Sequence, residues 1–323
     1  MASVLVTGGA GFVGAHVCKA LARAGHRAVA YDNLVRGVRA AVKWGPLEVG
    51  DVLDRARLVD VMRRHKIEAV MHLAGLTVVH QSVDEPSRYY LNNVAGTIDV
   101  LAAMTAADVG AIVLSSSCTV YDDRVTGALA ETSPLSPGSP YAQSKLMIEG
   151  VAADVAAAHK LNWLALRYFN AAGADPDGEL FESDVPKVRL VPNLLRAAAR
   201  GDAMFRIQGE DYGTPDGTCI RDLIHVSDIA AAHVAALSRI SSVPHVINLG
   251  SGRGYSVRET LDAAARLTRK PIRTEVAARR SGDVAVRIAD ATLAKTALGW
   301  TPTRTSLDDI VGDAWRSRRW DND

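Results

Sequence analysis

The chain has 323 residues, of which 48% are hydrophobic and 23% are charged, and its formal net charge is +1. This composition excludes a disordered, collagenous or disulfide-rich protein, and the balanced charge excludes a global positive field that would attract nucleic acid or a membrane surface. No apolar run approaches the ~20 residues that a membrane-spanning helix requires.

The predicted elements alternate between strands and helices over the first half of the chain. An apolar run at 3–7 is cut off by glycines and predicts a buried parallel strand, and apolar positions at helical spacing follow over 14–24. Further buried-type strands are expected at 28–31, 47–49, 69–73, 111–115 and 163–168. This alternation predicts an α/β fold with a doubly wound parallel sheet (Rossmann).

The sequence pattern changes near residue 173. A turn cluster at 174–178 precedes sequence that is rich in arginine, interrupted by proline and less regular. We therefore expect a Rossmann domain over 1–173 and a smaller C-terminal mixed α/β domain over 174–323 that shapes a substrate site. One buried-type strand, 246–249, is expected to return to the main sheet.

A glycine-rich turn joins the first predicted strand to the first helix and is typical of a dinucleotide site. Gly8, Gly11 and Gly14 permit a tight turn, close approach to a pyrophosphate and close helix–strand contact. The N-terminus of the helix supplies N–H groups for the phosphates. Asp32 ends the second strand, where an acid accepts hydrogen bonds from both ribose hydroxyls and repels a 2′-phosphate. This favours NAD over NADP, although the nearby Arg36 would weaken that preference.

A second group of residues has the pattern of a proton relay. Ser139 and Pro140 predict a helix start, which puts Tyr141 and Lys145 on one face, while Ser117 lies at the carboxyl end of a strand. Free tyrosine has a pKa near ~10, and one positive charge at ~4 Å contributes about 4 kcal/mol, or roughly three pKa units. We therefore expect Lys145 and an oxidised nicotinamide to bring Tyr141 near neutrality, with Ser117 orienting the reacting oxygen.

These motifs carry a resemblance to a known family. The chain is similar to the extended short-chain dehydrogenase/reductases and, among them, to the UDP-glucose 4-epimerase family over nearly its whole length. The resemblance rests on VTGGAGFVG at 6–14, YDNL at 31–34, HLAGL at 72–76, YYLNNVAGT at 89–97, SSSCTVY at 115–121, PYAQSK at 140–145, LRYFNAAGA at 166–174, DGTCIRDLIHVSDIA at 216–230 and RRSGD at 279–283.

The resemblance implies NAD-dependent epimerisation at C4 of a UDP-sugar, with UDP-galactose to UDP-glucose as the leading reaction, a 4-keto intermediate and tightly bound NAD. It implies that 1–173 binds NAD, that 174–323 binds the UDP-sugar, and that a homodimer forms through stretches near 90–104 and 141–158. UDP-pentoses and UDP-N-acetylhexosamines are the alternative substrates.

The expected site residues follow from the motifs and this resemblance. The catalytic residues are Ser117, Tyr141 and Lys145. The cofactor-binding residues are Gly8, Gly11, Phe12, Val13, Gly14, Asp32, Asn33, Asp51, Val52, Leu73, Ala74, Gly75, Asn92, Ser115, Tyr141, Lys145 and Tyr168. The substrate-binding residues are Ser117, Tyr141, Phe169, Asn170, Arg221, Arg280 and Asp283. Two arginines suit a sugar diphosphate, and Asp283 matches a position that holds the uridine ribose.

Five positions depart from the family pattern and leave the preferred sugar open. Thr77 stands where a lysine is often found, and Asp122 replaces a glycine. Leu223 replaces a common tyrosine, and Gln208 stands where an aromatic residue often flanks the uracil. Arg287 occupies a position that the family associates with limiting sugar size, and we expect this long side chain at the rim of the site to disfavour N-acetyl sugars.

Other functions remain as alternatives. A nucleotide-sugar dehydratase needs acids beside the serine that ends the fifth strand, and Ser116, Ser117 and Cys118 fill that stretch. A net oxidoreductase would show a stoichiometric change in NADH. A non-enzymatic NAD-binding regulator would be expected to lack part of the relay, and Ser117, Tyr141 and Lys145 are all present.

The cysteines and histidines indicate neither disulfides nor a metal site. Cys18, Cys118 and Cys219 are far apart, and His72, His225 and His233 are scattered, without carboxylate or cysteine company at ligand spacing. The N-terminus lacks the basic region of a signal peptide. We therefore expect a reduced, cytoplasmic protein with no metal and with neither a nucleic-acid nor a membrane partner.

Overall fold

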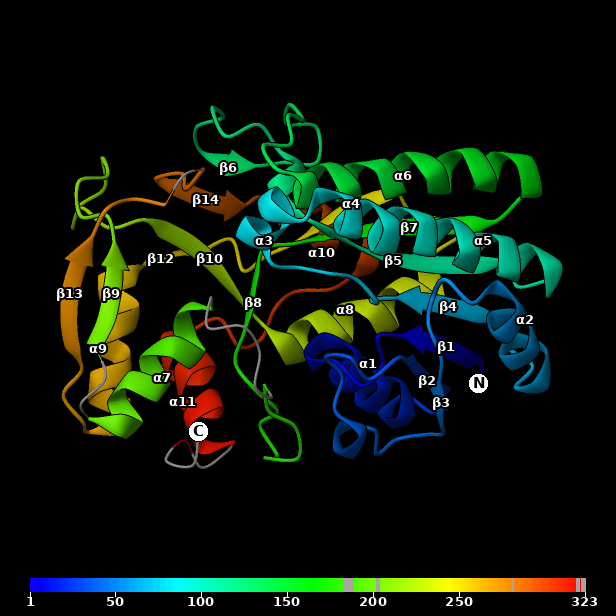
Figure 1. The fold of residues 1–323 in the computed structure, drawn as a ribbon, viewed down its shortest axis with the longest axis horizontal. Coiled ribbons are helices and arrows are strands. Elements are labelled where there is room, and N and C mark those ends of the chain that lie inside the picture. Colours follow the sequence, from blue (N-terminus) through cyan, green and yellow to red (C-terminus); the bar gives the residue numbers. More distant parts are fainter. Residues whose placement is uncertain (183–188, 202–203, 281, 318–319, 321–323) are drawn as a thin grey trace.

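The computed structural model describes residues 1–182, 189–201, 204–280, 282–317 and 320. Its central feature is a parallel sheet of seven strands, which runs through the right half of Figure 1. In spatial order the strands are β11 (Val246–Leu249), β7 (Asn162–Tyr168), β5 (Ala111–Ser117), β4 (Ala69–His72), β1 (Ser3–Thr7), β2 (Arg27–Asp32) and β3 (Leu47–Val49).

Helices cover both faces of this sheet, because successive strand residues point to opposite sides. In β1, Val4 and Val6 join one buried apolar cluster and Leu5 joins the other. The first cluster is closed by α1 (Phe12–Arg23), α8 (Val226–Arg239) and α10 (Thr292–Leu298). The second is closed by α2 (Arg55–Arg64), α5 (Gly96–Ala106) and α6 (Pro140–His159). The doubly wound α/β fold is thus confirmed.

A second layer of structure lies beside the carboxyl ends of the main strands (Figure 1). It holds a mixed sheet of β12 (Gly254–Ser256), β10 (Ile220–His225), β14 (Val286–Ala289), β6 (Ala128–Leu129) and β8 (Asn170–Ala172). A parallel pair joins β9 (Met204–Gln208) to β13 (Arg273–Ala277). The helices α7 (Leu190–Arg200), α9 (Val257–Thr268) and α11 (Leu307–Arg316) share a separate buried cluster.

Short helical segments connect the larger elements. They are η1 (Arg39–Ala41), α3 (Val79–Asp84), α4 (Pro86–Tyr89), the π-helical turn η2 (Tyr90–Ala95) and η3 (Cys118–Val120). Within the described residues, none of the helices has both the length and the apolar character that crossing a bilayer requires.

The two halves of the chain are interleaved in space. The strand at 246–249 forms the edge of the main sheet beside β7, and α8 and α10 pack on one face of that sheet. Conversely, β6 from the first half pairs with β14 in the second layer. The second half therefore contributes two helices to the layer around the main sheet as well as the expected strand, and the functional division at residue 173 stays a prediction.

Candidate active site

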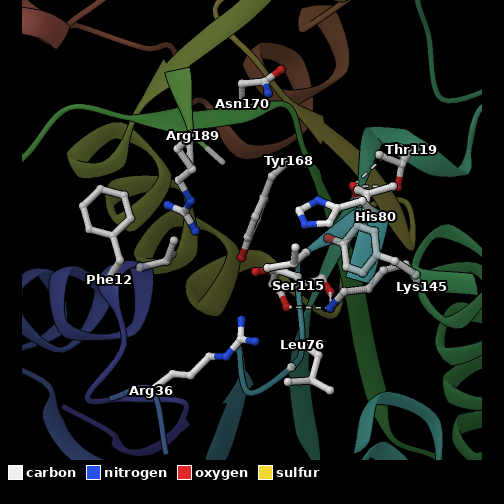
Figure 2. Close-up of a pocket in the computed structure, with 18 of the residues that line it drawn as sticks. Phe12, Arg36, Leu76, His80, Ser115, Thr119, Lys145, Tyr168, Asn170 and Arg189 are labelled. Carbon is white, nitrogen blue, oxygen red and sulfur yellow. Dashed lines mark hydrogen bonds between the residues drawn. The ribbon is translucent and has the colours of Figure 1, made fainter. Parts of the chain in front are cut away.

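A large cavity of about 1750 Å³ lies at the carboxyl ends of the main strands, where open α/β sheets bind ligands. Its lining contains every residue predicted for the site except Asp51. Figure 2 shows part of this lining, with side chains from both layers pointing into the pocket. The roles assigned to these residues stay predictions, but the fold brings them to one place.

The glycine-rich turn has the shape that a diphosphate cradle requires. Gly8 has φ +71°, and a Cβ there would lie 2.8 Å from the backbone nitrogen of Ala74. A Cβ on Gly14 would overlap the carbonyl oxygen of Gly8. Glycine is therefore needed at both positions, because the turn of β1 packs against the end of β4 and against its own helix. The open backbone leaves the hollow in which a dinucleotide fits.

The carboxylate of Asp32 faces this turn from the end of β2. It accepts hydrogen bonds from the backbone N–H groups of Ala10 at 3.1 Å and Leu34 at 2.8 Å. Burial raises its pKa, and these two hydrogen bonds partly offset that effect. Asp51 instead turns to Asn33, whose side-chain amide donates to it at 2.9 Å. Asp51 thus supports a residue of the cavity wall without lining the cavity.

The hydroxyl of Ser117 is held in place by its neighbour Thr119. It accepts hydrogen bonds from the Thr119 backbone N–H at 3.2 Å and from the Thr119 hydroxyl at 3.0 Å. Both lone pairs of the Ser117 hydroxyl oxygen therefore accept hydrogen bonds, which leaves its O–H group free to donate to another acceptor. Ser117 also has a hydrogen bond with Tyr141. The strand-end serine and the helix tyrosine are therefore in contact, as the relay requires.

The lowered pKa expected for Tyr141 stays a prediction, because it depends on the oxidised nicotinamide as well as on Lys145. Burial raises the pKa of Tyr141 to about 12, and its hydrogen bond with Ser117 and the charge of Arg189 offset that only in part. Lys145 is buried, and its ammonium donates to the carbonyl oxygen of Ser115 at 2.7 Å and to the Ser115 hydroxyl at 3.2 Å (Figure 2). Desolvation of the phenolate therefore outweighs the help available from the protein's own groups.

A buried ion pair lies behind the relay. The guanidinium of Arg167 donates to the carboxylate of Glu149 at 2.9 and 2.6 Å, and the hydroxyl of Ser116 donates to Glu149 at 2.5 Å. Burial lowers the pKa of Lys145 to about 8, and the charge of Glu149 acts in the opposite direction. Glu149 thus favours the protonated form of Lys145, one helical turn away on α6.

The predicted substrate residues lie across the cavity, in the second layer. Asn170 is in β8 and Arg221 is in the neighbouring β10, while Arg280 and Asp283 follow β13. The Arg221 guanidinium pairs with the Asp283 carboxylate at 3.4 Å. An arginine beside an acid suits a diphosphate next to a ribose, because the phosphates bind a cation and the ribose hydroxyls donate to a carboxylate.

The sequence led us to expect Arg287 at the rim of the site, but the structure places it inside the cavity wall. It is 8% exposed, it donates to the carbonyl oxygen of Cys118 at 2.6 Å, and its guanidinium pairs with the carboxylate of Asp123. The pairing of β14 with β10 sets it beside Arg221, inside the cavity wall. Its side chain is therefore held in one place by two partners.

Sequence reasoning missed several residues that line the cavity from α7 and α3. Arg189, at the start of α7, has its guanidinium 5.4 Å from the centre of the Phe12 ring and points into the pocket (Figure 2). His80 on α3 and Asn193 on α7 also line it. The arginine-rich sequence after residue 178 predicted a region that shapes the substrate site, but no local pattern indicated that α7 faces the glycine turn.

One acidic cluster has a structural explanation. Asp175, Asp177 and Glu179 come close enough together to hold a metal ion. The buried ammonium of Lys19 lies among them, at 2.5, 2.8 and 2.6 Å from the three carboxylates. The cluster thus fastens the loop after β8 to α1.

Comparisons with known proteins agree with this geometry. The family model described as "NAD dependent epimerase/dehydratase family" matches residues 4–250. A UDP-glucose 4-epimerase of Rhizobium leguminosarum bv. trifolii is 42% identical over 97% of this chain and 96% of its own length. A crystal structure of UDP-glucose 4-epimerase from Brucella ovis in complex with NAD is 43% identical, covers 98% of both chains and has a TM-score of 0.94.

A second solved structure is equally similar in shape. The UDP-glucose-4-epimerase from Stenotrophomonas maltophila, with bound NAD and formylated UDP-arabinopyranose, is 37% identical over 98% of both chains and also has a TM-score of 0.94. The fold and the site thus define a dinucleotide-dependent α/β enzyme. The chain belongs to the NAD-dependent epimerase/dehydratase family, and its cofactor is NAD.

Proposed function

We propose that this protein epimerises C4 of a UDP-sugar, with UDP-galactose to UDP-glucose as the main reaction. The observation that carries the proposal is the convergence of Ser117, Tyr141 and Lys145 with the glycine turn in one cavity. The relatives named UDP-glucose 4-epimerase, which match nearly the whole chain, support the same reaction.

The chemistry divides between the cofactor and the chain's own residues. When bound, NAD accepts a hydride from C4 and returns it, and its oxidised ring adds a positive charge near the relay. Tyr141 takes the proton of the C4 hydroxyl and gives it back, while Ser117 orients that oxygen. The charge of Lys145 favours the ionised form of Tyr141. Hydride and proton both return, so the reaction has no net oxidation or reduction.

Inversion at C4 requires the hydride to return to the other face of the sugar. The glycine turn and Asp32 hold the dinucleotide, so the 4-keto sugar has to turn over instead. Arg221, Arg280 and Asp283 anchor the nucleotide end in the second layer, which leaves the sugar free to rotate about its diphosphate linkage. Ser117 and Tyr141 then meet either orientation of the ring.

The direct test divides the purified protein into two samples: one is heated to release its cofactor for identification, and the other is incubated in its native state with UDP-galactose. We expect the denatured protein to release NAD and not NADP, because the reaction regenerates the oxidised cofactor and Asp32 disfavours a 2′-phosphate. Chromatography should show UDP-glucose forming with no net change in NADH absorbance. Release of mainly NADP, or stoichiometric accumulation of NADH, would contradict the proposal.

The alternative reactions differ in the side chains that they require at the carboxyl end of β5. A dehydratase needs an acid to remove and return water, and β5 ends in serines that hydrogen-bond to Thr119 and Glu149 instead. The pentose alternative has some support, since one structural relative contains formylated UDP-arabinopyranose. UDP-pentoses therefore belong in the substrate panel beside the hexoses and N-acetylhexosamines.

Arg287→Ser should relax the discrimination against bulky sugars. The buried Arg287, held by Asp123 and the Cys118 carbonyl, narrows the cavity, and serine would open that space. The ratio of kcat/KM for UDP-N-acetylgalactosamine to that for UDP-galactose should rise on the order of tenfold or more.

Arg124→Ser is the matched control, since Arg124 is exposed, pairs with Asp122 and does not line the cavity. The size restriction is wrong if wild type already prefers the N-acetyl sugar, or if Arg287→Ser leaves the ratio unchanged.

We also propose the homodimer and the cytoplasmic location that the sequence predicts. Leu91, Ile98 and Met147 are exposed apolar residues on the helical stretches expected at the interface, and burying them would stabilise association. Light scattering that reports only monomer would contradict the dimer. The proposed location rests on the sequence, in which the three cysteines are far apart.

A further inference from the structure

An arginine crosses the opening of the cofactor pocket and links two segments on its opposite sides. Arg36 lies in the loop after β2, and its Nη2 donates to the Oε1 atom of Gln81 on α3 at 2.9 Å. In the main sheet β1 lies between β2 and β4, the strand that precedes α3. The link therefore passes over the carboxyl end of β1, where the glycine turn receives the diphosphate.

The segment that carries Arg36 is fastened to the glycine turn. The backbone N–H of Val38 donates to the carbonyl oxygen of Ala10 at 2.9 Å, and Leu34 and Val35 are held by side-chain oxygens of Asp32 and Asn33. Arg36 itself is exposed, lines the cavity and reaches into the pocket in Figure 2. Because Arg36 is a long, exposed side chain on a fixed backbone, its hydrogen bond to Gln81 can break and re-form without disturbing the fold.

The far end of the link is also fixed. The side-chain amide nitrogen of Gln81 donates to Glu85 at 3.0 Å, which turns Oε1 toward Arg36. Oε1 lies 3.4 Å from the hydroxyl of the fully buried Tyr89, whose ring packs edge-on against Tyr141. Gln81 thus presents a fixed acceptor, supported by the same aromatic pair that holds the predicted base.

We propose that Arg36 and Gln81 form a clasp that closes over the diphosphate of bound NAD and sets the rate at which the cofactor leaves. The guanidinium has several N–H donors, so it can bind the phosphate oxygens and keep its hydrogen bond to Gln81 at the same time. A 4-epimerase restores its cofactor in each turnover, so slow release serves the reaction. The inference rests on the NAD site of the proposed function.

The test measures the release of NAD from the holoenzyme rather than its activity. The protein with bound NAD is mixed with excess alcohol dehydrogenase and ethanol, which convert each released NAD to NADH, and the fluorescence of NADH gives the rate. Arg36→Ala should release NAD at least about tenfold faster than wild type, since a charge-assisted contact is lost. Gln81→Met, which keeps the length but removes the acceptor, should give a smaller increase.

Two controls separate the clasp from a general charge effect. Arg39→Ala removes an exposed arginine of the same loop that does not line the cavity, and it should release NAD at the wild-type rate. Raising the ionic strength should speed release from wild type more than from Arg36→Ala, because salt screens the guanidinium–phosphate attraction.

Each other outcome has a distinct meaning. If Arg36→Ala and Arg39→Ala release NAD equally, within about twofold of wild type, the clasp is wrong while the NAD site stands. If Arg36→Ala loses affinity only for NADP, Arg36 contacts the 2′-phosphate and not the diphosphate. If wild type neither contains nor binds NAD, the cofactor of the proposed function is itself contradicted.

Discussion

Tyr141→Phe should lower epimerase turnover by about 10²–10⁴-fold, the usual contribution of one positioned acid–base group. The substitution removes the hydroxyl that exchanges the proton with the sugar and leaves the ring packed against Tyr89. The hydroxyl of Ser117 keeps both hydrogen bonds from Thr119, so no buried group loses its last partner. Folding, NAD content and UDP binding should therefore stay close to wild type.

The matched control is Tyr90→Phe. Tyr90 follows Tyr89 in the chain, and the side chain of Tyr90 does not line the cavity. It should retain the wild-type rate. The measurement is the rate of product formation at saturating UDP-galactose, with calorimetric binding of UDP as the check on the substrate site. Turnover by Tyr141→Phe within about tenfold of wild type would refute the assignment of the base.

Gly14→Ala should abolish the retention of NAD. The new Cβ would overlap the Gly8 carbonyl oxygen and press on Gly9, so the turn that cradles the diphosphate has to move. Overpacking of this kind typically costs about 1–3 kcal/mol, and here the displaced atoms are those that approach the cofactor. The variant should purify with little NAD and melt at a lower temperature than wild type.

Gly110→Ala provides the control for adding a methyl group at a glycine. Gly110 precedes β5, its φ is not positive, and its Cβ would meet no atom within 4 Å. NAD content and melting temperature should therefore match wild type. Full NAD occupancy in Gly14→Ala, with an unchanged melting temperature, would show that the turn is not the cofactor cradle.

Much of the site was predictable because its signals are local. Glycine spacing after a buried strand requires only one turn of chain, and Gly8 and Gly14 have the close contacts that this motif demands. Ser139 caps α6 through a 3.2 Å hydrogen bond from the Ala142 N–H, as a serine before proline predicts. Ser117 ends β5, so the strand boundary and the cap together bring the relay into contact.

The burial of Arg287 could not be read in the same way. Its partner Asp123 is 164 positions away in the sequence, and the two meet because β14 pairs with β6 and β10. The pKa of Tyr141 has a similar origin, since burial by residues from several elements raises it while Lys145 binds Ser115. Desolvation depends on everything that surrounds a group, and the four-residue spacing of Tyr141 and Lys145 carries no information about those surroundings.

Local sequence signals were enough to predict the succession of strands along the chain, the dinucleotide turn, the helix cap and the candidate relay residues, because periodicity, capping and turn chemistry act over a few residues. No local signal predicts that α7 places Arg189 beside Phe12, that Arg36 reaches Gln81 across β1, or that Asp123 pairs with Arg287. Those contacts join segments that are distant in the chain, and the packing of whole layers sets them.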